Sequence, residues 1–244
     1  MKTSFMMKQK PFFTRGQKNI IEKYNEENPY AVTMYRDNDP ELVKQRNMQE
    51  IEKMLPLLQL SENSRVLDIA CGIGRWSDAI TTKIEQYCGL DYCENFISKA
   101  CELNKGKDNR FFFVGGCNDV NDCLKRNNHT GRFNRILLMG VLLYLNDDDI
   151  KAVFREIYEV ADDHTVVLIR GPIALEERLT LKRHFSEELD DTYNAIYRTR
   201  DEMVAFMDEN LFKHGFKIKE EAFLYDESLN GHKETQQYYF VLER

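Results

Sequence analysis

Short apolar runs alternate with amphipathic stretches through the middle of the chain. The lack of polar alternation within the runs is typical of strands buried on both faces of a parallel sheet. Strand and helix in alternation predict right-handed crossovers and a doubly wound sheet of the α/β class. The runs are RVLDIA (65–70), QYCGLD (86–91), RFFFVG (110–115), FNRILLMG (133–140) and TVVLIRG (165–171), and the intervening helical patterns include GRWSDAITTKI, CENFISKACELNK and NDDDIKAVFREIYEVADD.

Both ends of the chain add elements to this core. Residues 40–58 place apolar side chains at helical spacings, which predicts an amphipathic helix behind Pro40 that ends near Pro56. After residue 200, RDEMVAFMDENLFKHGF predicts another helix, and KIKEEAFLYD and TQQYYFVLER predict two strands that pair as an antiparallel edge. The pattern therefore predicts a seven-stranded, mostly parallel sheet.

No internal repeat or low-complexity linker divides the 244 residues, so we expect a single domain. Its parts are an N-terminal helical cap (1–60), a central core (61–171), a lid (172–200) and a C-terminal helix with antiparallel strands (201–244). The lid is longer than an ordinary crossover and follows the fifth strand, at the edge where such sheets bind ligands.

We expect the lid to be helical. Helical spacing would then place two groups of side chains on separate faces. The groups are His184, Glu188 and Asp191 on one face, and Tyr193, Tyr197 and Arg200 on the other.

Composition excludes several classes of protein. The net charge of −7 leaves no basic stripe for a phosphate backbone, so we expect no nucleic-acid partner. The six cysteines form no CxxC pair and no cluster with histidine at metal-ligand spacing, so we expect reduced thiols and no metal. The basic N-terminus has no apolar run long enough for a signal peptide or a membrane span. We therefore expect a cytoplasmic protein without membrane insertion.

The first apolar run ends in a turn that suits a nucleotide-like ligand. Asp68 closes the strand, Gly72 and Gly74 form the turn, and a helix begins beside Trp76. The glycines allow a ligand to approach free N–H groups of the helix. The spacing differs from the G-x-G-x-x-G of dinucleotide enzymes, because Ser77 stands where the third glycine would be. An acid at the strand end can pair with an ammonium group. The pattern therefore favours a cofactor that contains an amino acid over the dinucleotide cofactor of an oxidoreductase.

The segment VLDIACGIGRW resembles motif I of the Rossmann-like S-adenosylmethionine-dependent methyltransferases, and residues 60–243 are similar to that family in the order of elements. The resemblance implies S-adenosylmethionine as cofactor and S-adenosylhomocysteine as product. It implies that Asp91 grips the ribose hydroxyls, and that Met139 and Gly140 line the methionine arm. Asn118, Asp119 or the N–H of Cys117 would lie near the adenine. The expected cofactor contacts are Asp68, Ala70, Cys71, Gly72, Gly74, Trp76, Asp91, Tyr92, Cys117, Asn118, Asp119, Met139 and Gly140.

The acceptor site must come from residues outside the common fold. Arginines of the lid could recognise phosphate or carboxylate groups, and its tyrosines could stack on a sugar ring. Because the sulfonium already activates its methyl group, catalysis needs positioning, with a general base where the acceptor is a hydroxyl. We expect His184 to be that base, and Tyr193 and Tyr197 to position the acceptor. The residues expected to bind the acceptor are Tyr35, Arg36, Tyr144, Arg170, Arg198 and Arg200.

The sequence thus predicts an S-adenosylmethionine-dependent methyltransferase acting on a hydroxyl or amine of a polar small molecule, such as a sugar, a phosphorylated compound or a polysaccharide precursor. Two alternatives stay open: a non-catalytic regulatory or assembly protein that binds S-adenosylmethionine, and an N-methyltransferase of an amino compound. Some site residues also have structural interpretations, with Asp119 as a helix cap, Trp76 in the core and His184 exposed. The acceptor, the methylated atom and the oligomeric state are left open.

Overall fold

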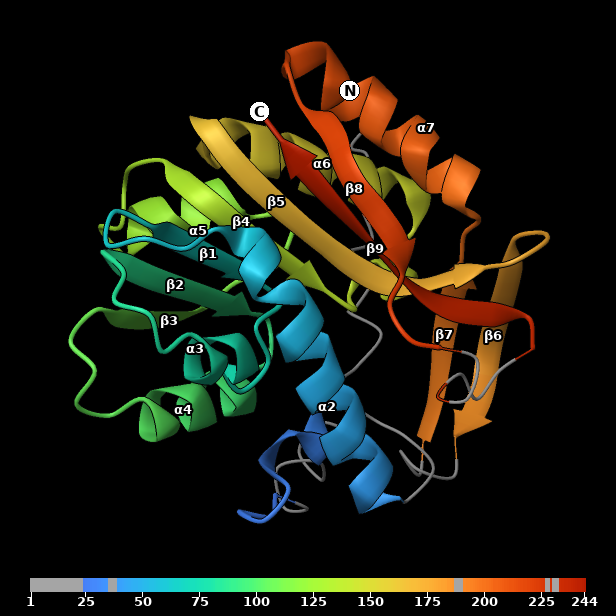
Figure 1. The fold of residues 1–244 in the computed structure, drawn as a ribbon, viewed down its shortest axis with the longest axis horizontal. Helices are drawn as coiled ribbons and strands as arrows, with labels where there is room; N and C mark the ends of the chain where they lie inside the picture. Colours follow the sequence, from blue (N-terminus) through green and yellow to red (C-terminus); the bar gives the residue numbers. More distant parts are fainter. Residues whose placement is uncertain (1–23, 35–38, 187–190, 227–228, 230–232) are drawn as a thin grey trace, which may run out of the picture.

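A seven-stranded sheet runs through the computed structural model, which describes residues 24–34, 39–186, 191–226, 229 and 233–244 (Figure 1). Its strands are β1 (Arg65–Ile69), β2 (Gln86–Asp91), β3 (Arg110–Val114), β4 (Phe133–Met139), β5 (Ala161–Ala174), β8 (Lys217–Phe223) and β9 (Thr235–Glu243). They lie in the order β3-β2-β1-β4-β5-β9-β8. Strands β1 to β5 pair in parallel, whereas β9 is antiparallel to β5 and to β8. The predicted sheet, including its antiparallel edge, is confirmed.

Helices cover both faces of this sheet (Figure 1). None of the helices in the described part of the chain is long and apolar enough to cross a membrane. The α-helices are α2 (Pro40–Met54), α3 (Arg75–Ala79), α4 (Glu94–Leu103), α5 (Val120–Arg126), α6 (Asp147–Val160) and α7 (Arg200–Asn210), and the 3-10 turns are η1 (Pro29–Val32), η2 (Pro56–Leu58), η3 (Leu142–Tyr144) and η4 (Phe212–His214).

Strand β1 shows why the apolar runs lack polar alternation. Val66 packs with Met54 and Trp76 on the face that α2 and α3 cover. Leu67 and Ile69 pack on the opposite face, beneath α5, α6 and α7. Both faces are therefore core, as a doubly wound parallel sheet requires.

Helix α2 crosses the face of the sheet in front of β1 and β4 (Figure 1) and is fixed there by a buried carboxylate. Glu50 is fully buried and forms an ion pair with Arg75 of α3, with 2.6 Å between Arg75 Nη2 and Glu50 Oε1. Its other oxygen pairs with Arg170 of β5 and accepts from the Tyr225 hydroxyl at 3.4 Å. The two guanidinium groups hold the pKa of Glu50 below its usual value against the opposing effect of burial. This cluster ties the N-terminal region to the glycine turn and to β5.

The prediction of a helical lid is wrong. After β5 the chain forms a β-hairpin of β6 (Leu179–Ser186) and β7 (Asp191–Tyr197), which makes a separate two-stranded sheet below the end of β5 (Figure 1). DTYNAIY contains Thr192, Tyr193, Ile196 and Tyr197, which are β-branched and aromatic residues that favour a strand, and LTLKRHFS pairs with it. The helical spacing of charges that suggested a lid helix is incidental.

The hairpin changes which side chains are neighbours. His184 lies opposite Tyr193 across the strands, and their rings meet edge-on with centroids 5.5 Å apart. They do not lie on separate faces of a helix as expected, and Glu188 lies outside the described residues. A register shift between Leu181 and His184 is accommodated by Arg183, which has a φ of 49°.

We expect Glu50→Gln to lower the free energy of unfolding by about 3–5 kcal/mol, because it leaves two buried guanidinium groups without their counter-charge. Urea unfolding checks this value. Glu52→Gln, on the exposed side of the same helix, is the matched control and should change stability by less than about 0.5 kcal/mol. Equal losses in the two variants would contradict the assignment.

Candidate active site

The turn after β1 has a backbone that only small residues tolerate. Ala70, Gly72 and Gly74 adopt φ values of 64°, 56° and 85°, in the left-handed region that favours glycine. A Cβ on Gly72 would lie 2.9 Å from Cγ2 of Thr33, so the N-terminal segment packs directly on the turn. The glycines therefore provide both the conformation and the close approach.

Asp91, at the end of β2, is bound to this turn. It is 6% exposed; its Oδ2 accepts from the N–H of Gly72 at 3.0 Å and its Oδ1 from the N–H of Cys93 at 2.9 Å. Burial raises the pKa of Asp91 to about 6, and the two hydrogen bonds oppose that rise. Each carboxylate oxygen has a further lone pair that could accept from a ribose hydroxyl.

Asp68 is a buried carboxyl group with a raised pKa and, within the described part of the chain, one unpaired oxygen. It is 1% exposed, and its Oδ2 accepts from the Tyr87 hydroxyl at 2.5 Å. Its Oδ1 is buried and has no hydrogen-bond partner among the described residues. Burial raises the pKa of Asp68 to about 7, and the hydrogen bond from Tyr87 and the charge of Arg75 act in the opposite direction. An unpaired buried carboxylate oxygen beside a glycine turn fits an ammonium group.

Cys71 is a packing residue in this turn. Its thiol is buried, and burial with the nearby Asp68 and Asp91 charges raises its pKa well above the usual value, so it is no nucleophile. A Cβ on Gly89 of β2 would lie 2.8 Å from Cys71 Sγ and equally close to Phe112 of β3. Two strands and the turn after β1 thus meet at one glycine.

The other expected cofactor residues occupy different environments. Trp76 is 2% exposed in the core, with Arg75 over its ring. Asp119 is the N-cap residue of α5, but its side chain makes no capping bond and accepts from Arg126 Nη2 at 2.7 Å. Tyr92 and Asn118 are exposed, Cys117 is half-buried, Met139 ends β4 and Gly140 follows it. Their contacts with a cofactor stay predictions.

The expected acceptor residues do not converge on one point. Tyr35 and Arg36 lie outside the described residues. Arg170 is paired with Glu50, and Arg200 is exposed and paired with Glu221. His184, Tyr193 and Tyr197 lie on the hairpin, and Tyr144 lies in η3.

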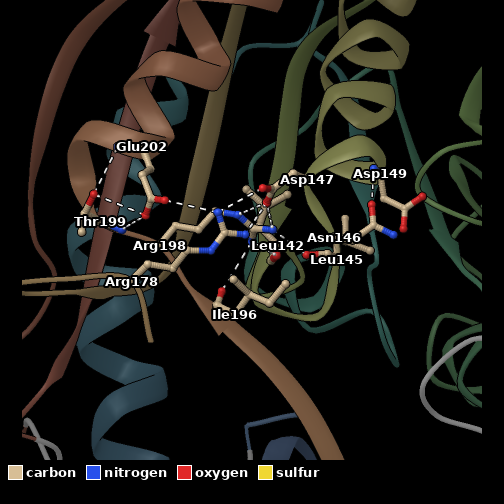
Figure 2. Close-up of polar contacts among 10 residues, drawn as sticks. All are labelled: Leu142, Leu145, Asn146, Asp147, Asp149, Arg178, Ile196, Arg198, Thr199 and Glu202. Atoms are coloured by element: carbon tan, nitrogen blue, oxygen red, sulfur yellow. Dashed lines mark hydrogen bonds and ion pairs between the residues drawn. The ribbon is translucent and has the colours of Figure 1, made fainter. Parts of the chain in front are cut away.

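Among the residues expected to bind the acceptor, Arg198 is buried within a network of hydrogen bonds (Figure 2). It is 2% exposed, and all five of its N–H groups have partners. Nε and Nη2 donate to Asp147 Oδ1, Nη2 also to the carbonyl of Leu145, and Nη1 to the carbonyls of Leu142 and Ile196. An acceptor could reach Arg198 only by displacing one of these bonds.

Sequence reasoning missed Glu50, Tyr87 and Asp147. Asp147 stands in the acidic run NDDD, a helix-start signal, and nothing local marks it as the partner of Arg198. Glu50 looks like any polar residue of an amphipathic helix. The described residues hold no group of three or more His, Cys, Asp and Glu that could bind a metal ion.

Comparison with known proteins finds a methyltransferase domain in the middle of the chain. The family model described as a methyltransferase domain matches residues 66–164. Phosphoethanolamine N-methyltransferase of Plasmodium falciparum is 26% identical over 154 residues, which are 63% of this chain and 52% of that protein. The chain therefore spans about half the length of this curated relative.

Solved structures share the fold at low identity. Phosphoethanolamine N-methyltransferase 1 of Haemonchus contortus, in complex with phosphoethanolamine and S-adenosylhomocysteine, has a TM-score of 0.64 at 14% identity and covers 93% of this chain and 48% of that one. The cyclopropane synthase MmaA2 of Mycobacterium tuberculosis has a TM-score of 0.64 at 16% identity and covers 95% of both chains. These solved methyltransferases share the fold of this chain, and its residues 66–164 match the methyltransferase-domain model.

We expect affinity for S-adenosylhomocysteine to rise by up to about tenfold between about pH 6 and pH 8, because Asp68 ionises near pH 7 and only its charged form attracts the ammonium. Calorimetric titration of the wild type and of Asp68→Asn measures this. In both proteins the amine of the ligand titrates, but only the wild type has a carboxyl group that titrates at position 68. The same pH profile in both proteins would show that Asp68 does not pair with the ligand.

We expect Asp91→Asn to weaken S-adenosylhomocysteine binding at least about tenfold, since it removes charge-assisted bonds to the ribose. The amide oxygen still accepts from one of the two backbone N–H groups, so the thermal midpoint should fall less than in Asp91→Ala, which leaves both unpaired. Asp108→Asn, exposed beyond α4, is the control. Unchanged affinity in Asp91→Asn would make this acid purely structural.

Proposed function

We propose that this chain, whose residues 66–164 form a Rossmann-like, S-adenosylmethionine-dependent methyltransferase domain, transfers a methyl group to the amine of a small, polar, anionic compound. The pair Asp68 and Asp91 at adjacent strand ends carries the cofactor part of this proposal. The amine part rests on the two phosphoethanolamine N-methyltransferases that resemble the chain. Phosphoethanolamine is accordingly the first acceptor to test.

The residues around the turn fit the cofactor. S-adenosylmethionine supplies a methyl group that its sulfonium already activates. Asp68 offers its unpaired oxygen to the ammonium, and Asp91 offers both oxygens to the ribose. Thr33 packs on Gly72, so the N-terminal segment borders the turn. The protein's main contribution is then to hold the methyl group and the acceptor in line.

Two tyrosines near the carboxyl ends of the strands suit an amine acceptor. Tyr92 follows β2 and Tyr144 lies in η3, while the neighbouring Arg170, in β5 beside Met139, pairs with Glu50. Tyr144 lies near enough to couple electrostatically with both Tyr92 and Arg170. Phenolic oxygens and aromatic faces hold amines well. An amine that arrives deprotonated needs no dedicated base, which agrees with the exposed position of His184 on the hairpin.

Transfer to a hydroxyl of a sugar or polysaccharide precursor is the second candidate. It is favoured by the tyrosines of the hairpin, Tyr193 and Tyr197, which could position a sugar ring. It requires a general base, and His184 is the residue we expect to serve. The cytoplasmic location and the non-catalytic alternative stay predictions.

We expect the protein to methylate phosphoethanolamine, with ethanolamine at least about tenfold worse in kcat/KM because it lacks the anionic group. Mass spectrometry of the product and release of S-adenosylhomocysteine measure the reaction. His184→Ala should change kcat less than about threefold, because an amine needs no base.

Methylation of a hydroxyl compound, with a loss of about 100-fold or more in His184→Ala, would favour O-transfer instead. S-adenosylhomocysteine binding without turnover of any amine or hydroxyl compound would favour the non-catalytic alternative. Lys182→Ala, exposed on the same strand, controls for disturbance of the hairpin.

A further inference from the structure

The segment between β4 and α6 is held by an arginine from a distant part of the chain. Residues 140–146 follow the strand end that is expected to line the methionine arm, and they include η3. Arg198, just beyond β7, donates to the carbonyls of Leu142 at 3.2 Å and Leu145 at 2.8 Å (Figure 2). It also donates to the carboxylate of Asp147, the first residue of α6, at 2.9 and 2.6 Å. One guanidinium thus fixes this segment at several points.

Both ends of the hairpin insertion meet at the same carboxylate. Arg178, which precedes β6, donates to the two oxygens of Asp147 at 3.0 and 2.6 Å. Arg198, which follows β7, donates to Oδ1 of the same carboxylate (Figure 2). Hydrogen bonds from the two arginines hold the pKa of Asp147 below its usual value against the effect of burial. The carboxylate therefore joins the start and the return of the hairpin to the start of α6.

The segment that follows β7, at the end of the hairpin, is also hydrogen-bonded to the sheet. The carbonyl of Arg198 accepts from the N–H of Ala174, the last residue of β5, at 2.9 Å. The next residue, Thr199, caps α7 in a reciprocal arrangement with Glu202. Glu202 also accepts from Arg178 at 3.2 Å. A displacement of the hairpin must therefore change the bonds that Arg198 makes to residues 140–146.

We propose that Arg198 and Asp147 are positioning residues for methyl transfer, which make the orientation of residues 140–146 depend on the seating of the β6–β7 hairpin. The inference rests on the proposed function, because this segment would border the acceptor and the methyl group. Arg198 acts through the backbone of Leu142 and Leu145 and touches neither reactant. Lysine cannot substitute, since a single ammonium cannot reach two carbonyls and a carboxylate in the fixed fork of a guanidinium.

The test compares the wild type with Arg198→Lys and Asp147→Asn, with Arg155→Lys on the exposed face of α6 as the matched control. Backbone amide exchange of residues 140–146 is measured with and without S-adenosylhomocysteine, together with its affinity and the kinetics of methyl transfer to phosphoethanolamine. If Asp147→Asn does not fold, Arg198→Lys, which keeps the positive charge, still tests the proposal.

We expect exchange of residues 140–146 in the S-adenosylhomocysteine complex to be at least about fivefold faster in Arg198→Lys than in the wild type. Ligand affinity should stay within about threefold, whereas kcat/KM for the acceptor should fall at least about tenfold. Arg155→Lys should match the wild type in each measurement.

Unchanged exchange of residues 140–146 in Arg198→Lys would overturn the inference, whatever the kinetics. So would a loss of ligand affinity that matches the loss of kcat/KM, because the arginine would then act through cofactor binding alone. A wild type that methylates no acceptor would refute the proposed function, whereas the exchange measurements would still decide the positioning role.

Discussion

The structure depends on one buried carboxylate placed between two arginines. Glu50 lies on α2, yet its partners come from the helix after the glycine turn and from β5, so three parts of the chain far apart in sequence are fixed relative to one another. Removing a carboxylate from water is costly, and only good geometry with both guanidinium groups offsets the cost. That geometry exists only when α2 lies across the sheet. The ion cluster therefore specifies where the N-terminal region sits, and the apolar core beneath it supplies the stability.

Buried charge also defines the cofactor end of the sheet. Asp68 and Asp91 are both nearly inaccessible, and burial raises the pKa of both. Burial makes ionisation of both carboxyl groups costly, and the ammonium of a ligand would offset that cost at Asp68, whose Oδ1 is unpaired among the described residues. Such stored unfavourable energy is common where a binding site is shaped before its ligand arrives. Arg198 differs from these carboxyl groups because each of its N–H groups has a partner within the protein, and its role is to fix geometry.

Much of the fold could be predicted because its signals are local. The apolar runs, the acid before the glycines and the late antiparallel strands all lie within short windows of sequence, and the structure confirms the sheet. The prediction of a helical lid was wrong because helical spacing of charged residues outweighed the strand-favouring residues of DTYNAIY, and pairing across the hairpin selects the strands. The burial of Arg198 could not be predicted, because its partners lie at Leu142, Leu145 and Asp147, and only the fold brings these together.

The contact of Cys71, Gly89 and Phe112 has a consequence for evolution. Gly89 has an ordinary strand conformation, so what excludes a side chain there is space already taken by the sulfur and the ring. Because both neighbours are equally close, alanine at 89 needs smaller residues at both positions. Among relatives, these three positions should therefore vary together, with their summed side-chain volume kept nearly constant. Gly72 and Gly74, whose backbone itself requires glycine, should show no such compensation.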